Sequence, residues 1–195
     1  ITLKPGKIPI NMESGDFNRD GINDLAVTMR YHKVMILLGK GKGRFKSPVS
    51  VPVKGQPTAI VLGDYDKNKV IDIAVALAGS GKTGVQILWG KGDGTFEKGI
   101  AFSGGGGPIA LTAGHFNSDH MVDIAIANSR SSNFSLVIRK TNGFFHYPTR
   151  DYLVDGGTPL AITSGDYNED GMTDIAVAGN AKNIIELYLQ RRVFN

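Results

Sequence analysis

The stretch GDFNRDGINDLAV, residues 15–27, decides the fold because it recurs three more times in the chain. Its counterparts are GDYDKNKVIDIAVA (63–76), GHFNSDHMVDIAIA (114–127) and GDYNEDGMTDIAVA (165–178). The four stretches begin at residues 15, 63, 114 and 165, which gives a period close to 50 residues. A fixed period of this length indicates a repeat architecture, so the chain is expected to fold as four successive copies of one unit.

Each repeat predicts four strands, as the second repeat illustrates. A strand in GQPTAIVL (55–62) precedes the acidic stretch, and the apolar DIAVA (72–76) follows it without a break. A third strand, GVQILWG (84–90), leads through a glycine-rich hairpin to a fourth in GIAFSG (99–104). No ten-residue stretch shows helical spacing. Four antiparallel strands in about 50 residues describe a propeller blade.

The predicted fold class is therefore all-β, a β-propeller of four ~50-residue, four-stranded blades in a single domain, residues 1–195. The chain stops at Phe194-Asn195, before a fourth strand, and ITLKPG (1–6) is in register with a fourth strand. This register predicts that the N-terminal segment completes the last blade, giving a four-bladed ring. The alternative is four consecutive blades of a larger propeller.

The acidic stretch has the composition of a Ca²⁺ loop. Counted from Asp16, oxygen-bearing side chains stand at positions 1, 3, 5 and 9, a carbonyl is available at position 7, and glycine stands at position 6. Alternate hard oxygen ligands around a sharp glycine turn suit Ca²⁺. The pattern is similar to the first half of an EF-hand loop, without its Glu at position 12 or its helices. We therefore predict a Ca²⁺ loop between two strands.

The four loops differ in how well they fit this pattern. The first (16–24) and fourth (166–174) are intact, with predicted ligands Asp16, Asn18, Asp20, Ile22, Asp24, Asp166, Asn168, Asp170, Met172 and Asp174. The second loop (64–72) is expected to bind less well because Lys69 stands at the glycine position. Its predicted ligands are Asp64, Asp66, Asn68, Val70 and Asp72.

The third loop, 115–123, departs from the metal pattern. His115 replaces the first aspartate and His120 replaces the glycine, so its remaining acidic residues are Asp119 and Asp123. Two carboxylates and an imidazole make a poor Ca²⁺ site, and we expect a loop held by hydrogen bonds. The alternative is a transition-metal site formed by these four side chains. Every loop also has Phe or Tyr at position 2, which we expect to pack between blades.

Together these features resemble the FG-GAP/VCBS-type repeat of Ca²⁺-binding β-propellers, which is also found in integrin α-subunit heads. The residues that carry the resemblance are the loops GDFNRDGINDLAV and GDYNEDGMTDIAVA and the hairpins LLGKGKGRF (37–45) and LWGKGDGTF (88–96). The resemblance implies an extracellular, cell-surface or periplasmic protein with a role in adhesion or in binding carbohydrate or protein. It also implies seven or eight blades, whereas this chain has four repeats.

Composition narrows the possible functions. The absence of cysteine excludes a disulfide scaffold and a cysteine-based zinc site. No apolar stretch approaches the ~18 residues of a membrane span. We find no nucleophile-elbow serine, and the metal loops use most of the carboxylates, so we predict no catalysis. The leading function is a Ca²⁺-stabilised extracellular recognition or adhesion module. The alternatives are a structural segment of a larger secreted or envelope assembly and a carbohydrate-active propeller enzyme.

The net charge of +4 suggests an anionic partner. Each predicted turn between the second and third strands carries a cation, namely Arg30, Lys82, Arg130 and Lys182. In a closed ring these cations would surround one mouth of the propeller. We predict binding of an acidic glycan or an acidic protein surface there, with an oligomer or larger assembly as a further option, and no nucleic-acid partner.

Overall fold

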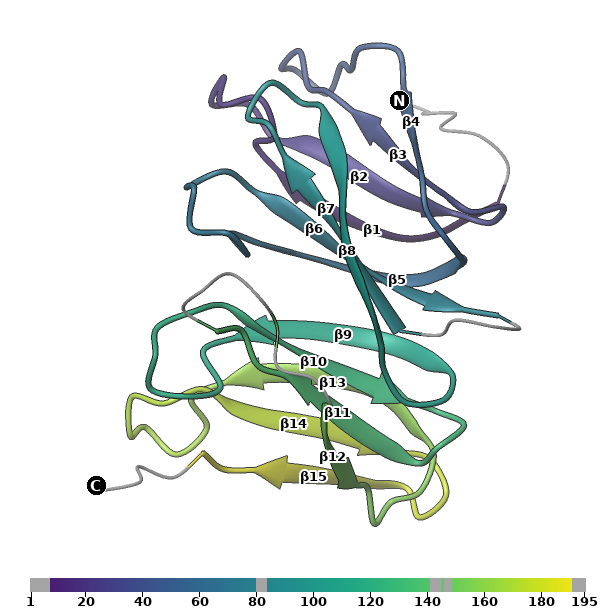
Figure 1. The fold of residues 1–195 in the computed structure, drawn as a ribbon, viewed down its shortest axis with the longest axis vertical. Helices are drawn as coiled ribbons and strands as arrows, with labels where there is room; N and C mark the ends of the chain where they lie inside the picture. The colour runs from purple at the N-terminus through teal and green to yellow at the C-terminus, as the bar shows by residue number, and fades with distance from the viewer. Residues whose placement is uncertain (1–7, 80–83, 141–144, 146–148, 191–195) are drawn as a thin grey trace. The chain divides into compact units, whose positions relative to one another are not determined.

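A computed structural model describes residues 8–79, 84–140, 145 and 149–190, which contain fifteen strands and no helix (Figure 1). The strands are β1 (Pro9–Gly15), β2 (Asp24–Met29), β3 (Lys33–Leu37), β4 (Val49–Pro52), β5 (Gln56–Gly63), β6 (Asp72–Ala78), β7 (Gly84–Gly90), β8 (Phe96–Ser103), β9 (Pro108–Gly114), β10 (Asp123–Asn128), β11 (Asn133–Val137), β12 (Arg150–Leu153), β13 (Pro159–Gly165), β14 (Asp174–Gly179) and β15 (Ile184–Tyr188). In the part of the chain that the structure describes, no helix has the length and apolarity needed to cross a membrane.

The strands form four antiparallel meanders, one for each predicted repeat, so the all-β propeller-blade class is confirmed. Blade 1 has the order β1-β2-β3-β4, blade 2 β5-β6-β7-β8, blade 3 β9-β10-β11-β12 and blade 4 β13-β14-β15. Blade 4 has three strands among the described residues. The predicted completion of this blade by residues 1–6 lies outside them.

The chain divides into two compact units. Ile1–Ser103 contains blades 1 and 2, and Gly104–Asn195 contains blades 3 and 4. The assignment of residues 1–195 to a single domain stays a prediction.

The second strand of each blade lies between the first and third, which explains its apolar sequence. All six residues of β10 are buried, and six of the seven residues of β6 are buried. Such strands are covered on both faces, so they read as continuous apolar runs rather than as an alternation. The fourth strands β4 and β12 are mostly exposed, as expected for the outer edge of a blade.

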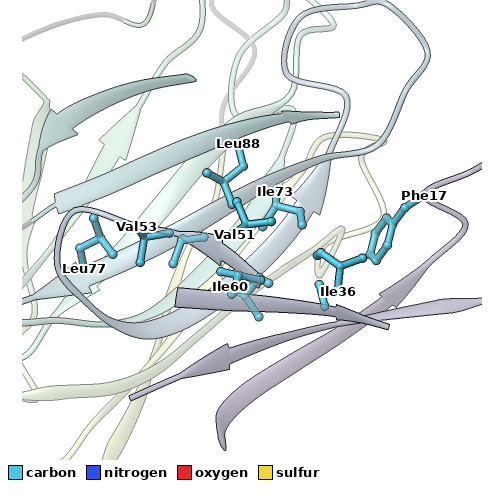
Figure 2. Packing of buried hydrophobic residues seen from close by; sticks show 11 residues of the cluster. Phe17, Ile36, Val51, Val53, Ile60, Ile73, Leu77 and Leu88 are labelled. Carbon is cyan, nitrogen blue, oxygen red and sulfur yellow. The ribbon is translucent and has the colours of Figure 1, made fainter. Parts of the chain in front are cut away.

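The core of the first unit lies between blades 1 and 2. Ala26, Val34 and Ile36 of blade 1 form one buried cluster with Ile60, Ile73, Val75, Leu77 and Leu88 of blade 2. Figure 2 shows side chains of both blades in this cluster. Phe17, at position 2 of the first loop, joins the cluster and meets Phe96 edge to face, with ring centroids 5.5 Å apart. The expected packing of this aromatic between blades is confirmed.

The second unit repeats this arrangement between blades 3 and 4. Phe116, Ala125, Ala127 and Phe134 of blade 3 cluster with Ile162, Ile175 and Val177 of blade 4. Phe134 also stacks on Tyr152, with centroids 4.9 Å apart and planes 9° apart, and meets Tyr188 edge to face. Phe116 therefore occupies the same place between blades as Phe17 does in the first unit.

Candidate metal loops

Each acidic loop joins the first and second strands of its blade, as the sequence predicts. The four loops connect β1 to β2, β5 to β6, β9 to β10 and β13 to β14. The acidic side chains lie at the point where a buried strand begins. The two strands of each pair are hydrogen-bonded neighbours, so each loop closes a β-hairpin.

The aspartate at position 1 organises the turn in three of the loops. In the first loop, Asp16 accepts hydrogen bonds from the backbone N–H groups of Asp20 at 3.1 Å and Gly21 at 2.8 Å. The same pair of bonds recurs in the second loop from Asn68 and Lys69 to Asp64, and in the fourth from Asp170 and Gly171 to Asp166. Backbone donors thus orient this carboxylate into the loop.

Positions 3 and 5 form a complementary pair in every loop. One position holds Asn and the other Asp, and the amide donates to the carboxylate at 2.9–3.0 Å. The first, third and fourth loops have Asn at position 3 and Asp at position 5, whereas the second has Asp66 at position 3 and Asn68 at position 5. The exchange keeps the hydrogen bond, because the asparagine amide can donate to the aspartate carboxylate from either position.

This exchange brings three carboxylates together in the second loop. Ligand oxygens of Asp64, Asp66 and Asp72 all lie within 4.8 Å of one another, and this is the one such group found among the described residues. Burial raises the pKa of Asp72 to about 6; hydrogen bonds from the Gly90 and Tyr65 N–H groups oppose this rise, and the charges of Asp66 and Asp64 add to it. A cation in this cluster would remove the repulsion. The second loop, expected to be weaker than the first and fourth, thus holds the closest carboxylate group.

The aspartate at position 9 has a role that the sequence did not reveal. Asp24, Asp72, Asp123 and Asp174 are fully buried. In each loop one carboxylate oxygen accepts the N–H of the position 2 aromatic at 2.8–3.1 Å. The other oxygen accepts an N–H that lies at or just after the end of the third strand; the donors are Gly39, Gly90, Arg139 and Gln190, at 2.6–2.8 Å. Position 9 therefore ties the loop to the third strand.

This structural role explains a residue that the metal pattern does not. Asp123 is retained in the third loop, although the first aspartate and the glycine of that loop are replaced. An aspartate kept at position 9 where the first aspartate and the glycine are replaced was the available signal for a role besides metal binding. Each carboxylate oxygen has two lone pairs, so a backbone hydrogen bond leaves one for a cation.

The third loop is held by its own hydrogen bonds. The ring Nδ1 of His115 lies 2.9 Å from the carbonyl oxygen of Met121. Met121 is at position 7 of this loop, and in the other three loops the carbonyl at position 7 is a predicted metal ligand. Asp119 accepts the N–H of Met121 at 2.8 Å. These contacts agree with the expectation of a hydrogen-bonded loop. Within the described residues, His115 and His120 belong to no close group of metal-ligand atoms, so the transition-metal alternative gains no support.

Position 6 is left-handed in all four loops, which explains the preference for glycine there. The φ angle is 79° at Gly21 and 81° at Gly171, and it is also positive at Lys69 (64°) and His120 (55°). A side chain in this conformation costs roughly 1–2 kcal/mol because Cβ approaches the following carbonyl oxygen. The second and third loops therefore carry backbone strain that the first and fourth avoid.

Replacing Lys69→Gly should raise the free energy of unfolding by about 1 kcal/mol, because glycine adopts the left-handed conformation without a Cβ. Urea denaturation in EDTA measures this gain. The matched control is Lys98→Gly, an exposed lysine on β8 without positive φ, where glycine should destabilise the strand. Equal losses in both variants would contradict the strain at Lys69.

Three of the four predicted ligand-binding cations lie in the expected turns. Arg30 follows β2, Arg130 follows β10 and Lys182 follows β14, and all three are exposed. Lys82 lies outside the described residues. The turns that carry these three cations are at the opposite ends of the second strands from the acidic loops, so the metal loops and the cations occupy different ends of blades 1, 3 and 4.

Comparison with protein families identifies the repeat. A family model described as the FG-GAP-like repeat matches residues 16–75 and 115–177, which together make up more than half of the chain. The protein belongs to the FG-GAP-like repeat family. Each matched region begins at position 1 of an acidic loop and extends into the second strand of the next blade.

The fold is similar to that of BBS1N in crystal structures of its complex with ARL6DN. The mercury-soaked crystal matches with a TM-score of 0.62 and 16% identity, covering 91% of this chain and 56% of that one. The lead-soaked crystal matches with a TM-score of 0.56 and 15% identity, covering 91% and 55%. At this identity the likeness shows the fold alone, and the chain spans little more than half the length of BBS1N. No curated protein matches the chain.

Proposed function

We propose that this protein is a Ca²⁺-stabilised, non-catalytic recognition module that acts outside the cytoplasm and binds a glycan or protein partner. The observation that carries the proposal is the group of Asp64, Asp66 and Asp72, whose ligand oxygens lie within 4.8 Å of one another. Family membership supports it, because both regions that the family model matches contain two of the acidic loops.

The chemistry of the donors favours Ca²⁺ over other cations. All predicted ligands in the first, second and fourth loops are carboxylate, amide or backbone oxygens, and the chain has no cysteine. Hard oxygen ligands select Ca²⁺, Mg²⁺ or Mn²⁺ rather than thiolate-binding metals. Irregular, multi-oxygen loops suit the flexible coordination of Ca²⁺ better than the strict octahedron of Mg²⁺. Extracellular modules work with weak Ca²⁺ sites, which supports a location where Ca²⁺ is abundant.

The opposite ends of the blades are the proposed recognition surface. Arg30, Arg130 and Lys182 are exposed there, and Lys82 is predicted to join them. Exposed cations at equivalent places in blades 1, 3 and 4 favour an acidic glycan or an acidic protein surface. The metal loops would keep the strands in place from the other end, so Ca²⁺ would affect binding through the stability of the blades.

A binding screen tests this function. The purified protein is applied to an array of uronate-bearing and sulfated glycans and to an acidic protein surface, in millimolar Ca²⁺ and then in EDTA. We expect binding that weakens with salt and in the double variant Arg130→Glu, Lys182→Glu, while the control Lys98→Glu on β8 binds normally. Binding that is unaffected by the double variant, or turnover of an acidic polysaccharide, would overturn the proposal.

A further inference from the structure

The first and second acidic loops are joined by one side chain. Arg19 stands at position 4 of the first loop, between the predicted ligands Asn18 and Asp20. Its Nη2 donates a hydrogen bond of 2.9 Å to the backbone carbonyl of Lys69, at position 6 of the second loop. Both loops lie in the first compact unit, Ile1–Ser103. Arg19 therefore links two predicted metal sites within that unit.

The second blade also contacts the stem of Arg19. A Cβ added to Gly92, in the hairpin between β7 and β8, would lie 3.3 Å from Nε and 3.5 Å from Cδ of Arg19. The side chain therefore passes close over this hairpin. The same hairpin donates the N–H of Gly94 to the carbonyl of Phe17, at position 2 of the first loop, at 3.0 Å. The first loop is thus attached to the second blade at positions 2 and 4.

The bond from Arg19 acts next to a predicted ligand. The carbonyl of Lys69 and the nitrogen of Val70 form one peptide unit, and the carbonyl of Val70 is the predicted ligand at position 7. The N–H groups of Lys69 and Val70 are bonded inside the loop, to Asp64 and Asn68. Arg19 holds the carbonyl of the same peptide unit from outside the loop, so it helps to orient the Val70 ligand.

The metal pattern alone does not require arginine at position 4. The fourth loop matches the first at positions 1, 3, 5, 6 and 9, yet it has Glu169 at position 4. An ionised carboxylate cannot donate a hydrogen bond to a carbonyl oxygen. The role of Arg19 therefore concerns the contact between the first two loops rather than the closure of its own loop.

We infer that Arg19 is a positioning residue that couples Ca²⁺ binding by the first loop to Ca²⁺ binding by the second. This inference rests on the proposed Ca²⁺ binding. Asn18 and Asp20 become fixed when the first loop closes around an ion, and the backbone of Arg19 is fixed between them. Arg19 then holds the Lys69 carbonyl, so the second loop loses less conformational entropy when it binds its own ion. The coupling is reciprocal, because each site must change the affinity of the other by the same factor.

Electrostatics act in the opposite direction. The guanidinium of Arg19 brings a positive charge to the second loop, which disfavours a second cation there. Arg19 and Lys69 are exposed, so salt screens this repulsion, whereas the hydrogen bond has a defined geometry. The two effects predict opposite results for the removal of Arg19: lost ordering weakens Ca²⁺ binding by the second loop, and lost repulsion strengthens it. We expect the ordering effect to be larger.

A Ca²⁺ titration of the full chain, followed by ¹⁵N NMR, tests the inference. The amides of Val70 and Gly171 report occupancy of the second and fourth loops separately. In Arg19→Met we expect the Ca²⁺ concentration that half-fills the second loop to rise about fivefold, at the low end of usual couplings, while the fourth loop is unchanged. The matched control, Lys42→Met, removes another exposed, left-handed cation (φ 54°), from the hairpin between β3 and β4. It should leave the Val70 titration unaltered.

Disabling the first loop provides the second arm of the test. The double variant Asp16→Asn, Asp20→Asn should weaken Ca²⁺ binding by the second loop by a similar factor, and adding Arg19→Met should then change little. A second loop whose affinity withstands both changes, or rises in Arg19→Met, would overturn the inference and leave the proposed Ca²⁺ binding intact. Amides that respond to millimolar Ca²⁺ in no loop would overturn both.

Discussion

Asp72→Ala should lower the free energy of unfolding by about 2–5 kcal/mol even when no metal is present. The carboxylate of Asp72 is fully buried and accepts the N–H groups of Tyr65 and Gly90, each at 2.8 Å. Alanine would leave both donors without an acceptor, and each unsatisfied buried group costs about 1–3 kcal/mol. Urea denaturation in EDTA, followed by circular dichroism, measures the loss.

Two control variants separate this structural role from metal binding. Asp123→Ala removes the equivalent carboxylate from the third loop, and we expect a comparable loss that added Ca²⁺ does not change. Asp66→Ala removes an exposed carboxylate whose hydrogen bonds stay within the loop, so its effect in EDTA should be small. If Asp72→Ala is as harmless as Asp66→Ala in EDTA, the position 9 carboxylates do not tie the loops to the third strands.

Millimolar Ca²⁺ should raise the melting temperature by about 10 °C or more relative to EDTA. One site stabilises the folded state by about 2.7 kcal/mol when the free ion is a hundredfold above the dissociation constant. For a domain of this size, 1 kcal/mol corresponds to about 2–4 °C. Two or three occupied loops therefore give a large shift, which differential scanning calorimetry measures directly.

The third loop provides a gain-of-function control for this prediction. The double variant His115→Asp, His120→Gly restores the residues that stand at these positions in the first and fourth loops. In EDTA the relief of the left-handed strain at His120 should offset the lost contact between His115 and Met121, so the melting temperature there should change little. The shift caused by Ca²⁺ should increase. The opposite variant, Asp64→Asn with Asp66→Asn, should reduce the shift. If Ca²⁺ leaves the melting temperature unchanged in the unaltered protein and in both double variants, metal binding by the loops is contradicted.

The blades were predictable because their determinants are local and repeated. Each feature of the repeat predicts one element: the 50-residue period predicts the repeats, the alanine-rich runs predict the buried second strands, and the glycine-rich stretches predict hairpins. The four antiparallel meanders agree with these predictions. The place of the acidic loops between first and second strands followed from the same pattern. The inter-blade packing of Phe17 and Phe116 was also predictable, since each aromatic stands beside a strand that is about to be buried.

The features that sequence reasoning missed depend on distant partners. The second oxygen of Asp24 accepts the N–H of Gly39, fifteen residues further along, and no local pattern marks that contact. The close carboxylates of the second loop result from an Asn/Asp exchange that looks neutral in the sequence. Ile185 and Leu187 of blade 4 are exposed, although they are apolar residues of a kind that the third strands of the other blades bury.

The central claim is that the first, second and fourth loops bind Ca²⁺ and the third loop does not. Isothermal titration of the EDTA-stripped and dialysed protein with CaCl₂ tests it most directly. We predict one equivalent for each of the first, second and fourth loops, three per chain, and two for the Asp64→Asn, Asp66→Asn variant. No binding heat at millimolar Ca²⁺, or a stoichiometry that the variant leaves unchanged, would contradict the claim.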